Sequence, residues 1–280
     1  MSIKIYAFAD EAGANLKEQI EAMKANELSG LEIRDVNGLN VSKLSLSQAK
    51  EIKKQLDDAE LEVWSIGSPI GKINLENDDF EEYLDVFRNT LEVSKILDAK
   101  CFRLFSFYIS EGRDYGDFKN EVIDRIGRFV EIAKPYDVKL CHENEKGIYG
   151  DIADRCLDIF KAHPSIGGVF DPANFVQCGE NTLKAWDMLG EYITYMHIKD
   201  AVSDGTVVPP GEGEGNLREI TAKYIKSGGR VFTMEPHLTA FGGLEALEKD
   251  GSRSGLGRYC FKNNRESFDF ACETFKKLII

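Results

Sequence analysis

The sequence predicts an α/β protein built as a single (β/α)₈ barrel. Strand-like and helix-like stretches alternate along the 280-residue chain, with little else between them. Four apolar strands end at a residue whose side chain is a common metal ligand. These residues are separated by 28, 26 and 38 positions, and each interval is about the length of one strand and one helix. The four residues are Glu143, Asp171, His197 and Glu235.

Eight strand–helix units are expected in order. The strands are 3–8, 30–34, 62–66, 101–105, 138–143, 166–171, 193–198 and 230–235. The helices that follow them are 15–26, 45–59, 79–97, 117–134, 152–162, 183–189, 217–226 and 267–278. Asn15 has the spacing to Glu18 of a helix-capping pair, and Asp151 is placed to cap the fifth helix. Eight such units favour closure of a parallel sheet into a barrel.

We expect one domain spanning residues 1–280. Although the chain exceeds the usual domain length of roughly 100 to 200 residues, α/β barrels reach about 250 residues as one unit. No interdomain linker or low-complexity segment interrupts the pattern. Two longer connections, 201–216 and 238–264, should lie on the face where the strands end.

Composition narrows the class of partner. The formal net charge is −13 and no run of Lys and Arg forms a basic stripe, which favours a small molecule over nucleic acid. No apolar run approaches the roughly 20 residues that span a bilayer, so no membrane association is expected. The first residues resemble a strand rather than a signal peptide, and six cysteines without a Cys-x-x-Cys pair favour a reducing, cytoplasmic location.

Side-chain alternation along the strands directs many charged groups into the barrel. A single acidic residue at a strand end is more often a helix cap or a loop acceptor than a ligand. Several charged residues in one barrel interior are harder to explain by structure alone, because charges removed from water must be offset by ions, by oppositely charged partners or by a metal. The expected inward-facing charged residues are Glu32, Arg34, Arg103, Glu143, Asp171, His197 and Glu235.

Three carboxylates and one imidazole form an oxygen-rich set of metal ligands. We expect one divalent ion, Mn²⁺ first, with Mg²⁺, Co²⁺ and Zn²⁺ as alternatives. Its open positions could take two adjacent oxygens of an α-hydroxycarbonyl sugar, whose enediolate the ion would stabilise. No nucleotide cofactor is expected, because the glycine-rich segment 211–215 contains Glu212 and Glu214 and lacks the lysine of a phosphate-binding loop.

Several motifs resemble one family across essentially the whole chain. They are Glu143-Asn144, Phe170-Asp171-Pro172-Ala173-Asn174, His197-Ile198-Lys199-Asp200, 211–215, Glu235-Pro236-His237 and 261–266. The chain resembles the sugar phosphate isomerase/epimerase family of xylose isomerase-like TIM barrels, which includes the ketose 3-epimerases. The resemblance implies that Glu143, Asp171, His197 and Glu235 bind the metal, and that Glu143 and Glu235 act as acid and base in proton transfer next to a carbonyl. A homodimer is an open alternative to a monomer.

Five further residues are expected at the substrate: Lys199, His237, Asn174, Arg103 and Glu145. Each also has a structural interpretation. Lys199 could instead pair with Glu145 or Asp200, and His237 could orient Glu235.

Asn174 could fix the turn after Pro172, and Arg103 is expected to pair with Glu32 or Glu145. The segment 241–258 reads as a lid whose Arg253 and Arg258 would clamp a substrate phosphate, or as a disordered or subunit-contacting excursion.

Other functions remain open on the same barrel. An inosose-type dehydratase would begin with the same proton removal and then lose hydroxide. An endonuclease IV-like DNA repair enzyme would require a three-zinc cluster, which four histidines in an acidic chain disfavour. A non-catalytic sugar-binding barrel would hold no metal.

Overall fold

A computed structural model of the chain describes residues 2–239, 259 and 261–279. Eight parallel strands close into a barrel in the order β1-β12-β9-β8-β7-β6-β5-β2. In chain order they are β1 (Lys4–Ala7), β2 (Gly30–Ile33), β5 (Glu62–Ile66), β6 (Cys101–Leu104), β7 (Lys139–Glu143), β8 (Gly167–Phe170), β9 (Ile193–Ile198) and β12 (Val231–Met234). The predicted fold class is therefore confirmed.

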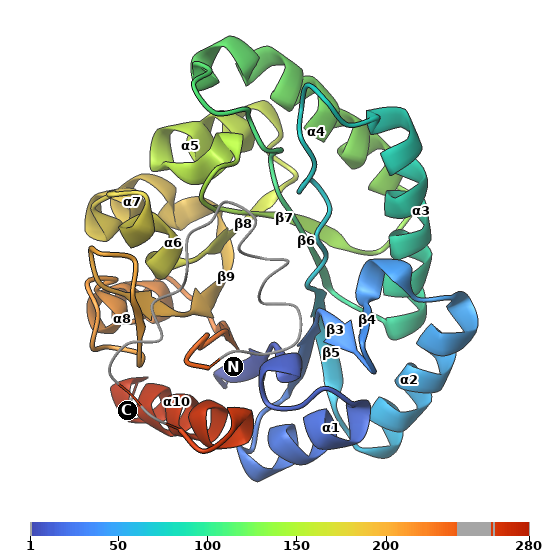
Figure 1. Ribbon diagram of the computed structural model, residues 1–280, viewed down its shortest axis with the longest axis vertical. Coiled ribbons are helices and arrows are strands. Elements are labelled where there is room, and N and C mark those ends of the chain that lie inside the picture. The colour runs from blue at the N-terminus through green and yellow to red at the C-terminus, as the bar shows by residue number, and fades with distance from the viewer. Residues whose placement is uncertain (1, 240–258, 260, 280) are drawn as a thin grey trace.

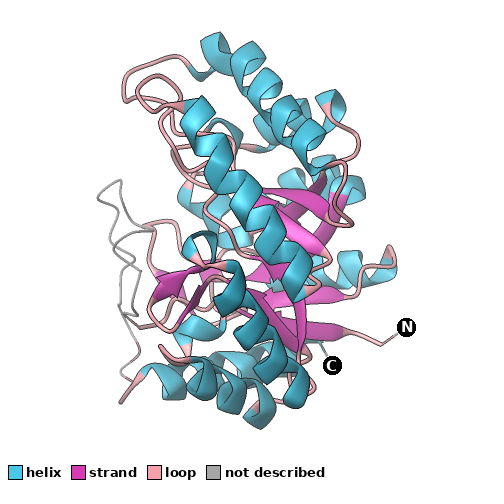
Figure 2. Cartoon of the chain, turned by 90° about the vertical axis from the view of Figure 1, so that its right-hand side faces the viewer, coloured by secondary structure: helices cyan, strands magenta, loops and turns pink. Residues whose placement is uncertain are grey.

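Helices surround these strands (Figures 1 and 2). They are α1 (Leu16–Ala25), α2 (Leu46–Asp58), α3 (Phe80–Leu97), α4 (Lys119–Ala133), α5 (Ala153–Ala162), α6 (Pro172–Gln177), α7 (Thr182–Leu189), α8 (Leu217–Lys226) and α10 (Asn264–Ile279). Every predicted strand and helix is present with small shifts at the ends. Short hairpins β3 (Asp35–Val36) with β4 (Leu39–Asn40), and β10 (Asp200–Ala201) with β11 (Val207–Val208), extend from strand ends.

Two helix starts test the capping predictions. Asn15 caps α1 as expected, since its side chain accepts from the Glu18 backbone and the Glu18 side chain accepts in return. The prediction for Asp151 is wrong, because the residue before α5 is Ile152, which makes no side-chain cap. Asp151 instead ends a 3₁₀ turn and pairs with Arg155, one helical turn further on.

Helix α6 was not predicted. It begins immediately after β8 and has six residues, too few to show a helical period in the sequence. Its start is nevertheless encoded locally. The side chain of Asp171 accepts from the backbone N–H of Asn174, and Pro172 occupies the first turn, where no N–H is needed.

The barrel interior is filled by layers of side chains. Residues two positions before the charged ones point to the same face, one layer closer to the amino ends of the strands. That layer is an apolar cluster of Cys101, Cys141, Val169 and Tyr195. Of the six cysteines, the five that the structure describes are free thiols, and all but Cys178 are buried, as small hydrophobic residues would be.

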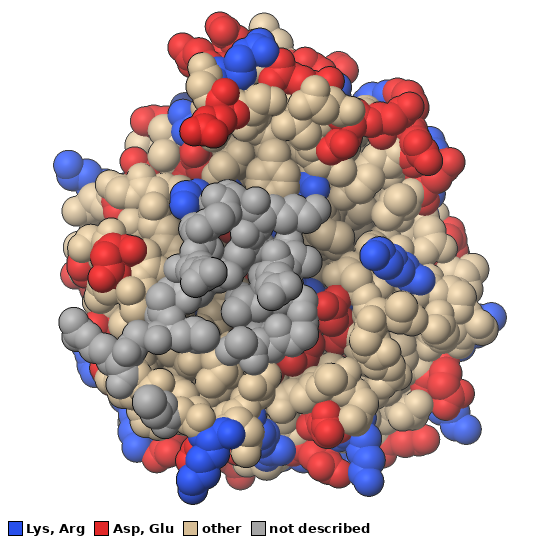
Figure 3. Space-filling model, viewed as in Figure 1, with Lys and Arg blue, Asp and Glu red and all other residues tan. Residues whose placement is uncertain are grey.

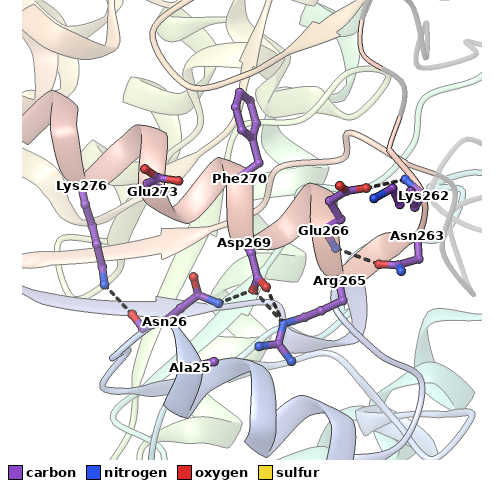
Figure 4. Close-up of a pocket in the computed structure, with 10 residues that line it drawn as sticks. All are labelled: Ala25, Asn26, Lys262, Asn263, Arg265, Glu266, Asp269, Phe270, Glu273 and Lys276. Carbon is purple, nitrogen blue, oxygen red and sulfur yellow. Dashed lines mark hydrogen bonds and ion pairs between the residues drawn. The ribbon is translucent and has the colours of Figure 1, made fainter.

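The last helix closes the ring against the first (Figure 4). Asn26, which ends α1, donates from Nδ2 to Asp269 of α10 at 2.5 Å and accepts at its carbonyl from Lys276. Arg265 holds the same Asp269 carboxylate from one turn away. These polar contacts flank an open groove on the outside of the barrel.

The surface charge and the lengths of the helices bear on the predictions about nucleic acid and membranes. On the face shown in Figure 3, the described Lys and Arg side chains lie scattered between Asp and Glu and form no continuous stripe. Among the residues that the structure describes, no helix combines the length and apolar character needed to cross a membrane.

Gly71, between β5 and α3, tests how tightly the chain packs above the strands. It has a φ of +94°, and an added Cβ would lie 2.1 Å from the carbonyl oxygen of Phe105. We predict that Gly71→Ala lowers the free energy of unfolding by about 2 kcal/mol or more, through positive-φ strain and overlap. The matched control is Gly112→Ala, since Gly112 has a φ of +79° with no atom within 4 Å and should lose about 1 kcal/mol. Equal losses in urea denaturation would contradict the packing argument.

Candidate metal centre

The four predicted ligands come together at the carboxyl ends of four adjacent strands. Glu143 is the last residue of β7, Asp171 follows β8, His197 lies in β9 and Glu235 follows β12. One ligand atom from each lies within 4.8 Å of all the others, and all four side chains are buried. The structure therefore assembles the set that the sequence predicted.

His197 presents one ring nitrogen to the three carboxylates. Its Nδ1 is 3.0 Å from Glu143 Oε1, 2.9 Å from Glu235 Oε2 and 4.0 Å from Asp171 Oδ2. Its Nε2 faces the other way and lies 3.1 Å from Glu32 Oε2. Nδ1 is thus the nitrogen available to a shared ion.

Negative charge exceeds positive charge around this cluster. The described residues include seven buried carboxylates and three buried Lys or Arg side chains. One carboxylate, Asp200, is enclosed by backbone N–H groups, and burial raises the pKa of Glu11 to about 8, so that it is mostly protonated at neutral pH. With His197 neutral, as it must be when it binds a metal, the other five outnumber the Lys and Arg cations by two. One divalent ion would balance the cluster.

Two ligand oxygens lack a hydrogen bond of suitable geometry. Asp171 Oδ2 and Glu235 Oε2 are buried without such a partner, although Lys199 Nζ lies 2.8 Å from the former and His197 Nδ1 lies 2.9 Å from the latter. Buried carboxylate oxygens are costly to leave in this state. The donor set, the charge balance and these oxygens all fit a divalent cation that prefers oxygen ligands.

The ionisation states suit metal binding. Burial opposes ionisation of Glu143, but His197 and Arg103 outweigh it and lower its pKa to about 2. Burial raises the pKa of Asp171 to about 6, with Lys199 opposing the rise. For His197, burial lowers the pKa, but Glu143 and Glu32 overcome this and raise it well above the ordinary value. Glu143 and Asp171 are therefore charged at neutral pH, and His197 carries a proton that a bound cation would displace.

Two arginines anchor the two glutamates in a similar way. Arg103 Nη1 donates to Glu143 Oε2 at 3.0 Å, and Arg34 Nη1 donates to Glu235 Oε1 at 3.0 Å. Each glutamate thus has one oxygen held by a guanidinium and the other directed toward His197. The expected pairing of Arg103 with Glu32 or Glu145 is wrong, because Arg103 in β6 lies beside the end of β7 and reaches Glu143 first.

Phe8, directly after β1, supports both anchors. Its ring centroid is 4.2 Å from Arg34 Cζ and 4.8 Å from Arg103 Cζ, a cation–π arrangement on a buried ring. The same ring meets His197 edge-on with a centroid distance of 5.2 Å. One apolar side chain therefore limits the movement of three site residues.

Lys199 pairs with the metal ligands and not with the partners expected from the sequence. Its Nζ is 2.8 Å from Asp171 Oδ2 and 3.7 Å from Glu235 Oε2. Burial would lower the pKa of Lys199, but these carboxylates raise it above its ordinary value, so it carries a positive charge. Glu145 instead binds Lys72, with Nζ and Oε2 at 2.7 Å.

Asn174 and His237 both contact the ligands. Asn174 Nδ2 donates to the Asn144 carbonyl at 2.8 Å and lies 3.4 Å from Glu143 Oε1. His237 Nε2 is 3.4 Å from Glu235 Oε1, and burial lowers the pKa of His237 to about 4, so it is neutral. These contacts support orienting roles for both residues.

Asn144 and the pair Asp10 and Glu11 were not singled out by the sequence. Asn144 exchanges two 3.0 Å hydrogen bonds with the backbone of Asp171, which ties one strand end to the next. Asp10 and Glu11 bind Arg34 from the 3₁₀ turn after β1. The sequence could have indicated Asp10 and Glu11, because these acidic residues also follow the end of an apolar strand.

The glycine-rich segment 211–215 surrounds a carboxylate of the chain itself. Backbone N–H groups of Gly211, Gly213 and Gly215 donate to Asp200 at 2.9, 3.0 and 2.9 Å. A Cβ at Gly213 would lie 2.3 Å from Asp200 Oδ1, so the loop can close only around glycine. These donors face Asp200, which fixes the chain next to Lys199. The predicted lid 241–258, with Arg253 and Arg258, lies outside the described residues.

The protein is a closed (β/α)₈ barrel with a candidate metal centre at the carboxyl ends of its strands. Comparison of the sequence with protein-family models identifies the family. Residues 20–250 match the xylose isomerase-like TIM barrel family. The chain belongs to this family, as its motifs predicted. Comparison with curated proteins found no significant match.

Solved structures share the fold at low sequence identity. The IolI protein with a bound zinc atom has a TM-score of 0.74 and 18% identity, over 99% of this chain and 98% of that one. D-Psicose 3-epimerase from Clostridium cellulolyticum H10, with D-tagatose, has a TM-score of 0.73 and 17% identity over 99% of both chains. The probable 3-DHS dehydratase AsbF from Bacillus anthracis has a TM-score of 0.72 and 16% identity, over 99% and 98%.

Asp200 tests the importance of the glycine-rich loop. Asp200→Asn replaces an acceptor oxygen with an NH₂ group that faces backbone donors, and we predict a loss of about 2 kcal/mol or more in unfolding free energy. The control is Asp204→Asn in the exposed turn nearby, where one oxygen accepts from Thr206 and an amide can do the same. It should lose less than about 0.5 kcal/mol. Chemical denaturation measures both, and a stable Asp200→Asn protein would contradict this role.

Proposed function

We propose that this protein is a divalent-metal-dependent isomerase or epimerase of a sugar or sugar phosphate. One observation carries the proposal. Glu143 and Glu235, from the outer two of the four ligand strands, each direct one oxygen toward the centre while an arginine holds the other. Two carboxylates with matching surroundings fit a reaction in which one removes a proton and the other returns it.

The proposed cofactor is one ion held by Glu143, Asp171, His197 and Glu235. The oxygen-rich donor set favours Mn²⁺, with Mg²⁺, Co²⁺ and Zn²⁺ as alternatives. The zinc atom in the IolI structure supports a metal in a barrel of this fold. When bound, the ion supplies positive charge that polarises a substrate carbonyl and offsets the negative charge left by proton removal.

The protein side chains then carry out the proton transfer. One glutamate takes the proton from the carbon next to the carbonyl, and the C–H electrons shift toward the carbonyl oxygen. The other glutamate returns a proton to the opposite face of that carbon, giving the epimer, or the proton returns to the neighbouring carbon, giving the isomer. Arg103 and Arg34 hold both carboxylates in place throughout.

Five residues near the centre are proposed to contact or support the substrate. Lys199 is a buried ammonium group 2.8 Å from Asp171 and could donate to a substrate oxygen. Asn174 and His237 lie against the two glutamates, and Arg103 acts through Glu143. Glu145, held by Lys72, lies at the edge of the site.

A dehydratase is the second candidate, and Lys199 is the observation that favours it. A lyase needs an acid near the departing hydroxyl group after the same first proton removal. The Lys199 ammonium lies 3.7 Å from Glu235, close enough to serve a neighbouring carbon. The probable dehydratase among the similar structures supports this chemistry on the fold.

Metal binding is the first test. We predict that isothermal titration calorimetry shows one Mn²⁺ per chain, and that Asp171→Asn weakens binding at least about tenfold because a charged ligand is lost. The control is Asp187→Asn, at an exposed ion pair with Lys223 on α7 and α8. Unchanged affinity in Asp171→Asn, or no binding by the native protein, would contradict the assignment.

Proton exchange is the second test. The metal-loaded protein is incubated in D₂O with a panel of ketoses, inososes and their phosphates, and deuterium next to the carbonyl identifies the substrate. We predict that Glu143→Gln and Glu235→Gln each lower this exchange by about 10² to 10⁴-fold. Glu92→Gln, which changes a contact between α3 and Tyr136 in the turn after α4, is the control.

Mass spectrometry of the same samples separates the two candidates. An epimer or isomer keeps the mass of the substrate apart from deuterium, whereas a dehydratase product loses one water. Near-native exchange in either glutamine variant would rule out the acid/base pair.

A further inference from the structure

Glu32 lies on the far side of His197 from the ligand carboxylates. It belongs to β2, three strands from β9 in the barrel order, and reaches His197 across the interior. Its side chain is fully buried. Glu32 Oε2 is 3.1 Å from His197 Nε2, and Glu32 Oε1 accepts a 2.8 Å hydrogen bond from the Tyr195 hydroxyl. Both carboxylate oxygens are thus engaged.

The chain of contacts continues below the site. The Tyr195 hydroxyl lies 3.0 Å from Ser65 Oγ, and all of these groups are buried. Tyr195 is two residues before His197 on the same strand face, and their rings are 5.6 Å apart. Ser65, Tyr195 and Glu32 therefore form a continuous polar path that ends at the imidazole.

An imidazole ligand must place its proton on the correct nitrogen. A neutral ring has one N–H donor and one acceptor, and the nitrogen that binds a metal must be the acceptor. Nδ1 of His197 faces three carboxylates, so the proton has to reside on Nε2 when a cation is bound. A carboxylate can only accept, which makes Glu32 the complementary partner for an Nε2–H group.

We infer that Glu32 is a positioning residue that fixes the tautomer and the ring orientation of His197, so that Nδ1 is the metal ligand. The inference rests on the metal centre of the proposed function. Tyr195 holds Glu32 in turn, and Ser65 holds Tyr195.

A purely structural role, as counterion for a neighbouring arginine, accounts less well for these contacts. Arg103 is near Glu32, but its Nη1 donates to Glu143, its Nη2 donates to the Gly67 carbonyl, and its buried Nε has no hydrogen-bond partner. Glu32 therefore directs its oxygens to Tyr195 and His197 and makes no hydrogen bond with Arg103. Its hydrogen bonds connect it to the proposed metal ligand His197 and to Tyr195, two residues earlier on the same strand.

Zinc affinity tests the inference, with calorimetry as the measurement. We expect Glu32→Gln to weaken Zn²⁺ binding about 10- to 100-fold, the usual effect of losing such a partner. Tyr195→Phe, which leaves the carboxylate but removes one of its hydrogen bonds, should weaken binding less. The control is Asp10→Asn, which removes another buried carboxylate that binds Arg34 and touches no ligand. It reports the loss of a buried negative charge, together with any effect on Glu235 through Arg34, without a change at the partner of His197.

The tautomer is the second readout, which a merely structural role would not change. The chain has four histidines, so ¹⁵N-histidine labelling gives a simple NMR spectrum, and His197→Gln assigns the signal. In the Zn²⁺-loaded native protein, we expect a protonated Nε2 and a metal-bound Nδ1. This measurement needs no change at Glu32, so zinc bound through Nε2 would overturn the inference even if Glu32→Gln does not fold.

The outcomes separate this inference from the proposed function. A native protein that binds no Zn²⁺ or Mn²⁺ would remove the metal centre itself. A native protein that binds Zn²⁺ through Nε2, or a folded Glu32→Gln protein that binds as tightly as Asp10→Asn, would overturn the role of Glu32 and leave the metal centre intact.

Discussion

An excess of buried negative charge at one end of the barrel is the constraint on which the rest of the site depends. Carboxylates from the ends of β7, β8 and β12, from β2 and from the turn after β1 converge where three buried Lys and Arg side chains cannot balance them. Desolvated charges of one sign destabilise a fold unless ions or hydrogen bonds offset them. Two arginines, Lys199 and the proposed divalent cation together would balance this charge, and the same arrangement would suit an oxygen-rich substrate.

The surroundings of the centre hold its ligands in place. Arg103 and Arg34 fix the two glutamates, and Phe8 packs against both guanidinium groups. Beneath this layer, the buried side chains of Cys101, Cys141, Val169 and Tyr195 pack together in the barrel interior. Glu143 and Glu235 therefore have one constrained and one available oxygen each. Rigid support of this kind is what proton transfer at a defined distance requires.

Sequence patterns predicted the barrel strands, the described α-helices except α6, and the convergence of Glu143, Asp171, His197 and Glu235. These features depend on local periodicity and on the rule that barrel strands end at one face. They failed where the outcome depends on barrel closure. The partner of Arg103 is set by strand neighbours, and the contact between Glu32 and His197 spans the interior, so neither follows from spacing. Asp151 failed as a cap because it lies one residue before the capping position, which Ile152 occupies, and its carboxylate pairs with Arg155.

Anomalous X-ray diffraction tests the central claim most directly, using crystals grown with Mn²⁺ and data collected at the manganese absorption edge. The account predicts one strong anomalous peak about 2.0 to 2.4 Å from oxygens of Glu143, Asp171 and Glu235 and from His197 Nδ1. Fully occupied Mn²⁺ elsewhere in the molecule, with no peak among these four side chains, would contradict it.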